Sequence, residues 1–281
     1  MAGLFIAFVG LVLLFVAIAI NQRARVESGL VLEVDVFPET WESLLQERFA
    51  VYSKLPEFLR ERLRQRMIDF IAEKQFEPCG DIDTITEEMR VLVAGQACLL
   101  LVGRPQERLF PRLHSILIYP GAFRDRGKRM FGSDDGHEDD DRSIRLGESW
   151  NTGSVILSWD SVKRGAASDD DGMNVVLHEF AHQLDQADGS TDGTPALDAA
   201  RDYIDWEKVM RREYDALVEE THNPRARPLL DPYGAENPAE FFAVATETFF
   251  ELSAELLEEH PELYRELSDY YGVDPAEWIR P

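Results

Sequence analysis

The feature that most constrains the fold of this chain is an H-E-x-x-H pentad at residues 178–182. In a helix, side chains four residues apart lie on one face, so His178 and His182 can bind one metal ion together. Glu179 lies beside them, within reach of a water molecule at that metal. Asn174 is a favourable N-cap for such a helix. The pattern is typical of zinc metallopeptidases.

The residues around the pentad favour a buried helix, because apolar side chains cover nearly every side of it. These residues are Val175, Val176, Leu177, Phe180, Ala181 and Leu184. Two histidines and a carboxylate in such a helix need partners, because buried polar groups without partners are costly. The alternative is a chance match on a surface helix, since the motif fixes only three positions.

A catalytic zinc site needs a third protein ligand and an open fourth position. The extended form of the motif, with a third histidine in the same segment, is excluded because residue 188 is Asp. A second helix, with Asn237 as cap and Pro238 as its first residue, offers Glu240 as the best candidate. Glu247 shares its face, so one carboxylate is expected to bind metal and the other to orient a ligand. Glu240 also stands at the capping-box position, and a capping role is the alternative.

Several separated segments resemble one family in the right order. They are L-H-E-F-A-H-Q-L-D at 177–185, Y-G-A-E-N-P-A-E-F-F-A at 233–243, I-L-I-Y-P-G-A-F at 116–123 and G-E-S-W-N-T-G-S-V-I-L-S-W at 147–159. Over roughly residues 40 to 275, the chain resembles the MtfA (Mlc titration factor A) peptidases, zinc-dependent bacterial enzymes of the gluzincin type.

The resemblance implies that His178, His182 and Glu240 bind Zn²⁺ and that Glu179 is the catalytic base. It also implies that Tyr233 lines the site, where it is a candidate hydrogen-bond donor to the oxyanion. Members of the family have been associated with aminopeptidase-like activity and with binding a glucose-responsive transcriptional repressor. That partner does not follow from the residues of this chain.

Two residues near the pentad have open roles. His137 lies in an acidic stretch at 133–141, where some relatives carry a histidine that approaches the zinc; the alternative is a solvated loop histidine. Asp185 could accept the outer N–H of a metal-bound histidine, or it could begin the Asp-rich turn through Asp188 and Gly189.

The composition limits the classes of partner. The chain has 281 residues with 29 Lys and Arg against 53 Asp and Glu, a net charge of −24. Such a surface repels phosphate backbones, so no nucleic-acid partner is expected. Cys79 and Cys98 do not form a disulfide framework or a metal-ligand pair.

Residues Ala2 to Ile20 form an uninterrupted apolar run, long enough to span a bilayer as a helix. Arg23 and Arg25 follow it, so we expect a single-pass anchor in the bacterial inner membrane with the catalytic domain in the cytoplasm. A cleaved signal ending near Ala17-Ile18-Ala19 and a buried core helix are the alternatives. The expected organisation is an anchor and basic flank at 1–25, a linker at 26–40 and a zincin-like metallopeptidase domain at 41–281.

Periodicity and punctuation predict an α+β fold, mostly helical, with a small sheet over the active-site helix. The expected helices lie at 38–49, 56–74, 86–101, 198–220, 238–257 and 255–271, the strands at 116–119 and 155–159, and a short strand or linker at 30–37. The strand at 155–159 is expected to pair with an extended peptide at the edge of the sheet, although an ordinary core strand fits the same residues.

The function expected from the sequence is metal-assisted hydrolysis of peptide bonds, with a peptide or protein as substrate. Zinc would activate the attacking water, and Glu179 would act as general base. The alternatives are a regulatory protein-binding module with a structural zinc, and a membrane-anchored adaptor with an acidic docking surface. Glu179 argues for the enzyme, because binding zinc does not require that carboxylate.

Overall fold

The computed structural model describes residues 37–121, 124–125, 128–129, 153–197 and 200–278. The predicted anchor at 1–25, most of the segment at 30–37, and His137 lie outside these residues. Among the helices that are described, none is both long and apolar enough to cross a membrane. The predicted boundaries of anchor, linker and catalytic domain stay predictions.

The sheet has three parallel strands in the order β1-β2-β5. They are β1 (Gln75–Pro78), β2 (Ser115–Tyr119) and β5 (Ser154–Ser158). Ile116 of β2 pairs with Phe76 on one side and with Val155 on the other. Within the described part of the chain, β5 therefore lies at an edge of this sheet. A separate two-stranded ribbon joins β3 (Arg124–Asp125) to β4 (Lys128–Arg129).

The helices before residue 170 pack against one another and, through the last of them, against the sheet. They are α2 (Glu39–Arg48), α3 (Glu57–Glu73), α4 (Glu87–Leu99) and α6 (Trp159–Ala167), with a 3₁₀ turn at Ala50–Lys54. Thr86 caps α4 by accepting a hydrogen bond from the backbone N–H of Met89 at 3.2 Å. The predicted helices at 38–49, 56–74 and 86–101 are confirmed within a few residues.

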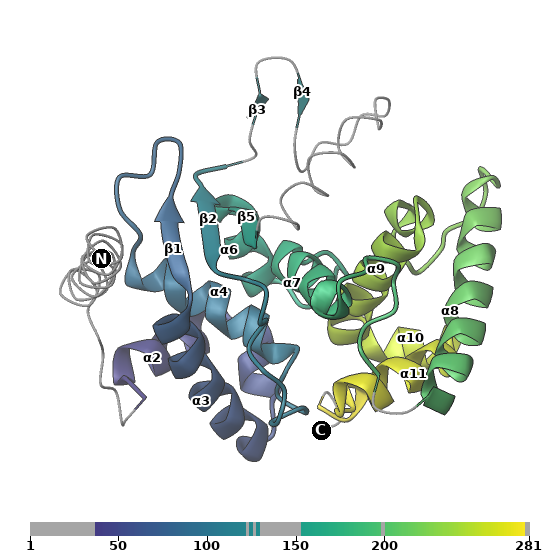
Figure 1. Cartoon of the computed structure of the whole chain (residues 1–281), viewed down its shortest axis with the longest axis horizontal. Helices are drawn as coiled ribbons and strands as arrows, with labels where there is room; N and C mark the ends of the chain where they lie inside the picture. The colour runs from purple at the N-terminus through teal and green to yellow at the C-terminus, as the bar shows by residue number, and fades with distance from the viewer. Residues whose placement is uncertain (1–36, 122–123, 126–127, 130–152, 198–199, 279–281) are drawn as a thin grey trace, which may run out of the picture. The chain divides into compact units, whose positions relative to one another are not determined.

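The helices of the second half follow α7 (Val175–Asp185). They are α8 (Ala200–Thr221), α9 (Pro238–Glu251), α10 (Ser253–Glu259) and α11 (Pro261–Tyr271), with 3₁₀ turns at Gln186–Asp188, Pro232–Ala235 and Pro275–Glu277. Figure 1 shows α7 between the sheet-bearing half and this helical half. The predicted α+β fold, mostly helical with a small sheet, is confirmed.

Three predicted element boundaries are wrong. The helix expected at 238–257 is interrupted at Leu252, and the helix expected at 255–271 is interrupted at His260. Both residues leave helical geometry, and Pro261 begins α11 without an N–H to donate. Trp159 begins α6 instead of ending the strand, since Ser158 caps this helix. The strand β1 was not expected; its Phe76 is the buried residue in an otherwise exposed segment.

Aromatic packing fixes α7 against the first half of the chain. The ring of Phe180 lies with its centroid 5.7 Å from Phe70 of α3 and 4.7 Å from Phe110. All three rings are fully buried. The helix that carries the pentad is therefore held from the side opposite α9.

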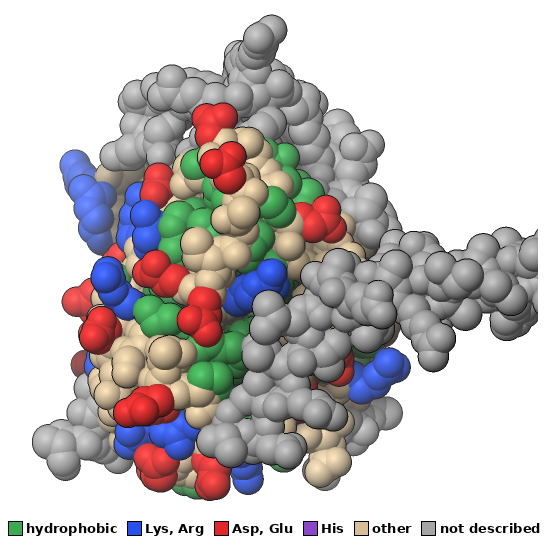
Figure 2. All heavy atoms as spheres, turned by 90° about the vertical axis from the view of Figure 1, so that its left-hand side faces the viewer, with side chains coloured by type: hydrophobic (Ala, Val, Ile, Leu, Met, Phe, Trp, Pro, Cys, Tyr) green, Lys and Arg blue, Asp and Glu red, His purple; other side chains and the backbone are tan. Residues whose placement is uncertain are grey.

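The face to the left in Figure 1 carries charges of both signs, as Figure 2 shows. Among the ion pairs of the described residues, Arg64 of α3 pairs with Glu42 at 2.9 Å and with Glu57 at 3.0 Å.

Candidate metal centre

The N-terminus of α7 is built as the sequence predicts. The Oδ1 atom of Asn174 accepts hydrogen bonds from the backbone N–H groups of Val176 and Leu177, both at 3.1 Å. The cap fixes the first turn of the helix, and the next two turns carry His178 and His182 on one face. The helix is buried along most of its length, as expected.

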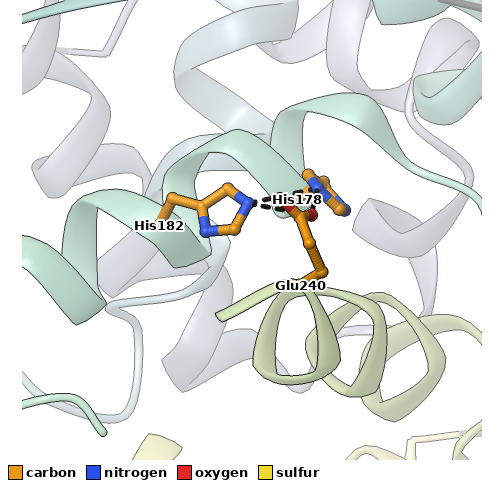
Figure 3. A group of neighbouring side chains, drawn as sticks. All are labelled: His178, His182 and Glu240. Atoms are coloured by element: carbon orange, nitrogen blue, oxygen red, sulfur yellow. Dashed lines mark hydrogen bonds and ion pairs between the residues drawn. The ribbon is translucent and has the colours of Figure 1, made fainter. Parts of the chain in front are cut away.

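The start of α9 is capped in the same way. Asn237 accepts hydrogen bonds from the N–H groups of Ala239 and Glu240, and Pro238 takes the first helical position. The side chain of Glu240 points at the two histidines of α7, as Figure 3 shows. This geometry favours the metal-ligand interpretation of Glu240 over the capping-box alternative.

Three donor atoms from these two helices meet at one point (Figure 3). The Nε2 atom of His178 lies 3.0 Å from Oε2 of Glu240 and 3.2 Å from Nε2 of His182. The third side of the triangle, from His182 Nε2 to Glu240 Oε2, measures 3.3 Å.

The size of this triangle fits a metal ion. Ligand atoms at about 2.0–2.2 Å from a tetrahedral zinc ion lie roughly 3.3–3.5 Å from one another. Two imidazole nitrogens and one carboxylate oxygen are a donor set of catalytic zinc sites, which leave the fourth position open. The side chain of His182 is 1% exposed and that of Glu240 is 5% exposed, whereas His178 keeps 12%. The residues present can therefore hold a metal, with an approach beside His178.

Charge pairing sets the protonation of the cluster without metal. Burial alone would raise the pKa of Glu240, but its hydrogen bonds with His178 and His182 hold that pKa well below its usual value. Burial lowers the pKa of His182. Burial also acts to lower the pKa of His178, but the carboxylates of Glu247 and Glu240 raise it well above its ordinary value. An ionised Glu240 and a neutral His182 are the forms that bind metal.

Glu247 lies behind His178, on the side away from the donor triangle. Its Oε1 atom is 2.7 Å from Nδ1 of His178. A hydrogen bond at Nδ1 leaves Nε2 free to bind metal and fixes the orientation of the ring. The structure thus assigns Glu247 the orienting contact that its place on the face of α9 predicted.

Two residues with expected roles in the reaction lie near His178: Glu179 follows it in the chain, and Tyr233 lies near it in space. Glu179 is buried in α7 directly after His178. The ring of Tyr233 has its centroid 5.9 Å from that of His178, and the two planes are tilted by 37°. The roles of both residues stay predictions.

Asp185 shapes the loop after α7. Its Oδ2 atom accepts a hydrogen bond from the backbone N–H of Gly193 at 2.9 Å. Its Oδ1 atom has no hydrogen-bond partner among the described residues, so the expectation that Asp185 orients a metal-bound histidine has no support here. Burial raises the pKa of this carboxyl to about 7.

Glu251 was not among the expected site residues, but it binds the same N-terminal segment of α7 as Glu247 does. The spacing could have indicated this residue, because Glu251 follows Glu247 by four residues in a mostly apolar helix. Gly193, which donates its N–H to Asp185, was not expected to matter either.

Comparison with known proteins supplies the family. The family described as glucose-regulated metallo-peptidase M90 matches residues 20–272. The chain belongs to this family. The match spans both helices of the metal centre and confirms the resemblance on which the sequence analysis relied.

Relatives of this M90 chain include several proteins named Mlc titration factor A. The protein from Yersinia pestis is 31% identical over 228 residues, which are 77% of this chain and 80% of the relative. The one from Pectobacterium atrosepticum is 36% identical over 165 residues, 58% of this chain and 60% of the relative. An uncharacterized protein from Synechocystis sp. is 40% identical over 241 residues, 85% of each chain.

Proposed function

We propose that the protein is a zinc metallopeptidase that hydrolyses peptide bonds. The observation that carries this proposal is the triangle of donor atoms from His178, His182 and Glu240, placed on two buried helices beside Glu179. Membership of a metallo-peptidase family supports it. Because zinc binding alone does not require Glu179, its place inside the motif favours catalysis over a purely structural metal.

His178, His182 and Glu240 would hold the ion, which would act as a Lewis acid on the scissile carbonyl and on the attacking water. The carboxylate of Glu179 takes the proton of that water and passes it to the leaving amine. The hydroxyl of Tyr233 donates a hydrogen bond to the oxyanion, a contribution of about 3 kcal/mol where such a donor is preorganised.

The substrate in this proposal is an extended peptide or a protein segment. It pairs through its backbone with the edge of β5, which precedes α6 and α7 in the chain. Backbone pairing gives affinity that depends little on side chains. Among the possible modes of cleavage, we expect aminopeptidase-like removal of residues from the N-terminus of the peptide.

A regulatory role is the second candidate, and the names of the relatives favour it. Mlc titration factor A is named for an action on Mlc, and several proteins of that name align with most of this chain. In this alternative the protein sequesters a repressor or another partner, and zinc is mainly structural. Partner binding that survives removal of zinc would separate this role from catalysis.

The proposed location is the bacterial inner membrane, with residues 2–20 as a single anchor and the catalytic domain in the cytoplasm. The support is the apolar run itself and the two arginines that follow it, Arg23 and Arg25.

Metal analysis and peptide-library cleavage test the proposed activity together. We expect about one zinc ion per chain, the stoichiometry of a three-ligand site. Cleavage should stop when a chelator removes the metal and return when zinc is added. A chain that is fully loaded with zinc but leaves every peptide intact would support the binding module, and a chain that takes up no zinc would refute the site.

A further inference from the structure

The N-terminal end of α7 is held by two carboxylates from α9. Glu247 accepts a hydrogen bond from the backbone N–H of Asn174 with Oε2, the oxygen that does not contact His178. Glu251 accepts one from the Asn174 side-chain amide at 3.0 Å with Oε1, and one from the backbone N–H of Met173 at 3.0 Å with Oε2. All four oxygens of the two buried carboxylates are therefore hydrogen-bonded to α7 or to the segment that leads into it.

These contacts exceed what helix capping requires. Asn174 caps α7 with Oδ1, and this role leaves its Nδ2 group free for other partners. That group donates to Glu251 and to the backbone carbonyl of Gly165 in α6, both at 3.0 Å. Asn174 thus joins α6, α7 and α9 through one side chain, and a cap alone would not need Asn rather than Ser or Asp.

The same face of α9 carries Glu240, Glu247 and Glu251. These residues follow one another by seven and four positions, which is the spacing of one helical face. Glu240 meets the metal-binding nitrogens, Glu247 meets the far nitrogen of His178, and Glu251 meets the start of α7. We call the contacts of Glu247 and Glu251 with Met173 and Asn174 the clamp. The backbone N–H of His178 donates to the carbonyl of Asn174 at 2.9 Å, so the clamp is joined to this metal ligand through one helical turn.

Packing from α6 leaves the clamp little freedom. A Cβ atom at Gly165 would lie 2.8 Å from Cγ and 2.9 Å from Nδ2 of Asn174. Only glycine fits here, because Asn174 is held by hydrogen bonds on both ends of its amide and cannot move aside without breaking them.

We propose that Asn174 and Glu251 are positioning residues of the metal centre, which hold α7 on α9 so that Glu247 orients His178 toward the ion. The inference rests on the proposed metal site. It assigns to Glu251 and Asn174 a role in metal affinity and coordination geometry, although neither touches the donor triangle.

Glu251→Gln in the full-length chain tests this role. A glutamine keeps the size of the side chain but offers only one oxygen, so its amide N–H₂ meets either Asn174 Nδ2 or the N–H of Met173, where two donors oppose each other. We expect the dissociation constant for zinc to rise about tenfold, the lower end of the range for residues that support metal ligands. The visible absorption bands of the cobalt-loaded protein should shift, because they report coordination geometry and a merely structural residue would not move them.

Two further variants complete the test. Glu255→Gln makes the same replacement at an exposed residue of α10 and should keep the wild-type zinc affinity and cobalt spectrum. Gly165→Ala adds one methyl group against Asn174 without changing any charge, and should weaken zinc binding and shift the spectrum in the same direction as Glu251→Gln. If neither Glu251→Gln nor Gly165→Ala folds, Asn174→Ser decides the matter, because it keeps a capping oxygen but loses the amide that donates to Glu251.

The outcomes separate this inference from the proposed function. If the wild-type chain binds zinc and Glu251→Gln and Gly165→Ala both keep its affinity and spectrum, the positioning role is wrong while the metal site stands. If the wild-type chain binds no zinc or cobalt, the proposed metal site is wrong and the positioning role falls with it.

Discussion

Gly193 lies so close to Pro238 that a Cβ atom at position 193 would be 2.3 Å from the Pro238 carbonyl oxygen. Gly193 also has a φ of +79°, which side chains rarely tolerate, and donates its N–H to Asp185 at the end of α7. Pro238 is the first residue of α9, the helix of Glu240. The loop after α7 therefore sets the distance between the two ligand-bearing helices.

Gly193→Ala should destabilise the fold by more than about 1 kcal/mol, because alanine is strained at positive φ and its methyl group meets backbone. It should also weaken zinc binding, since α9 must move. Urea unfolding and a zinc titration measure the two effects. Gly189→Ala is the matched control: its φ is also positive, but its Cβ would meet the end of the Arg112 side chain at 3.0 Å. Equal zinc affinities in the two variants would contradict the spacing role.

Glu179→Gln keeps the size of the side chain and removes its basicity. Hydrolysis should fall by at least about a hundredfold, the usual contribution of a positioned acid–base group, while zinc stays bound. Metal analysis of the same sample is the necessary control. Near-normal cleavage by the zinc-loaded variant would exclude Glu179 as general base.

Glu240→Ala should abolish most zinc binding, because it removes one of three ligands. Glu247→Ala should weaken binding by about 10- to 100-fold, as expected for a residue that orients a ligand histidine. Equilibrium competition with a chelator measures both constants. A larger loss for Glu247→Ala than for Glu240→Ala would show that the ligand is misassigned.

The contact between α8 and the start of α11 should depend on pH. Nδ1 of His260 lies 2.8 Å from Oε2 of Glu213. The hydrogen bond with Glu213 raises the pKa of His260 above 6.5, although burial opposes it, and the bond with His260 lowers the pKa of Glu213 below 4.5. The contribution of protonated His260 to the free energy of unfolding is complete below about pH 6.5 and is lost as the pH rises through its raised pKa. The contribution of ionised Glu213 is lost as the pH falls through its lowered pKa.

His260→Gln should therefore cost most stability between about pH 4.5 and 6.5, on the order of 1 kcal/mol for a half-buried pair, and less above that range. Urea unfolding across pH 4 to 9 measures the difference from wild type. His222→Gln is the control, because His222 is exposed and contacts the backbone carbonyl of Val218. A wild-type advantage that does not shrink as the pH rises would contradict the pairing.

Removal of residues 1–25 should leave a soluble, folded chain that still binds zinc, because the proposed anchor adds no ligand to the metal centre. In cells, protease added to intact spheroplasts should leave the catalytic domain uncut, since Arg23 and Arg25 favour the cytoplasmic side. Rapid digestion, or a mature N-terminus near Asn21, would indicate an exported enzyme.

The helices around the site could be predicted from sequence because their signals are local. Asn174 and Asn237 each stand at the start of an apolar segment and mark a helix boundary to the residue. The face shared by Glu240 and Glu247 follows from helical spacing alone. When this face of α9 packs against α7, the carboxylates of Glu240 and Glu247 necessarily contact His178.

The parts that could not be predicted depend on contacts between distant segments. β1 is short and mostly exposed, and it becomes a strand only through its pairing with β2. The break at Leu252 has no proline or glycine to announce it. The contact of Gly193 with Pro238 and that of Gly165 with Asn174 arise from packing between segments, which no local pattern in the sequence encodes.

The metal ligands come from helices far apart in the chain, since His178 and Glu240 are separated by 62 positions. During synthesis, a chain that ends before Pro238 has the pentad but lacks the third ligand, so it can hold zinc only weakly. Closing so long a loop is slow compared with forming either helix, and the ion cannot act as a template for the first one. Zinc should therefore be acquired late, after α9 has docked, and its uptake can serve as a kinetic marker for the completion of folding.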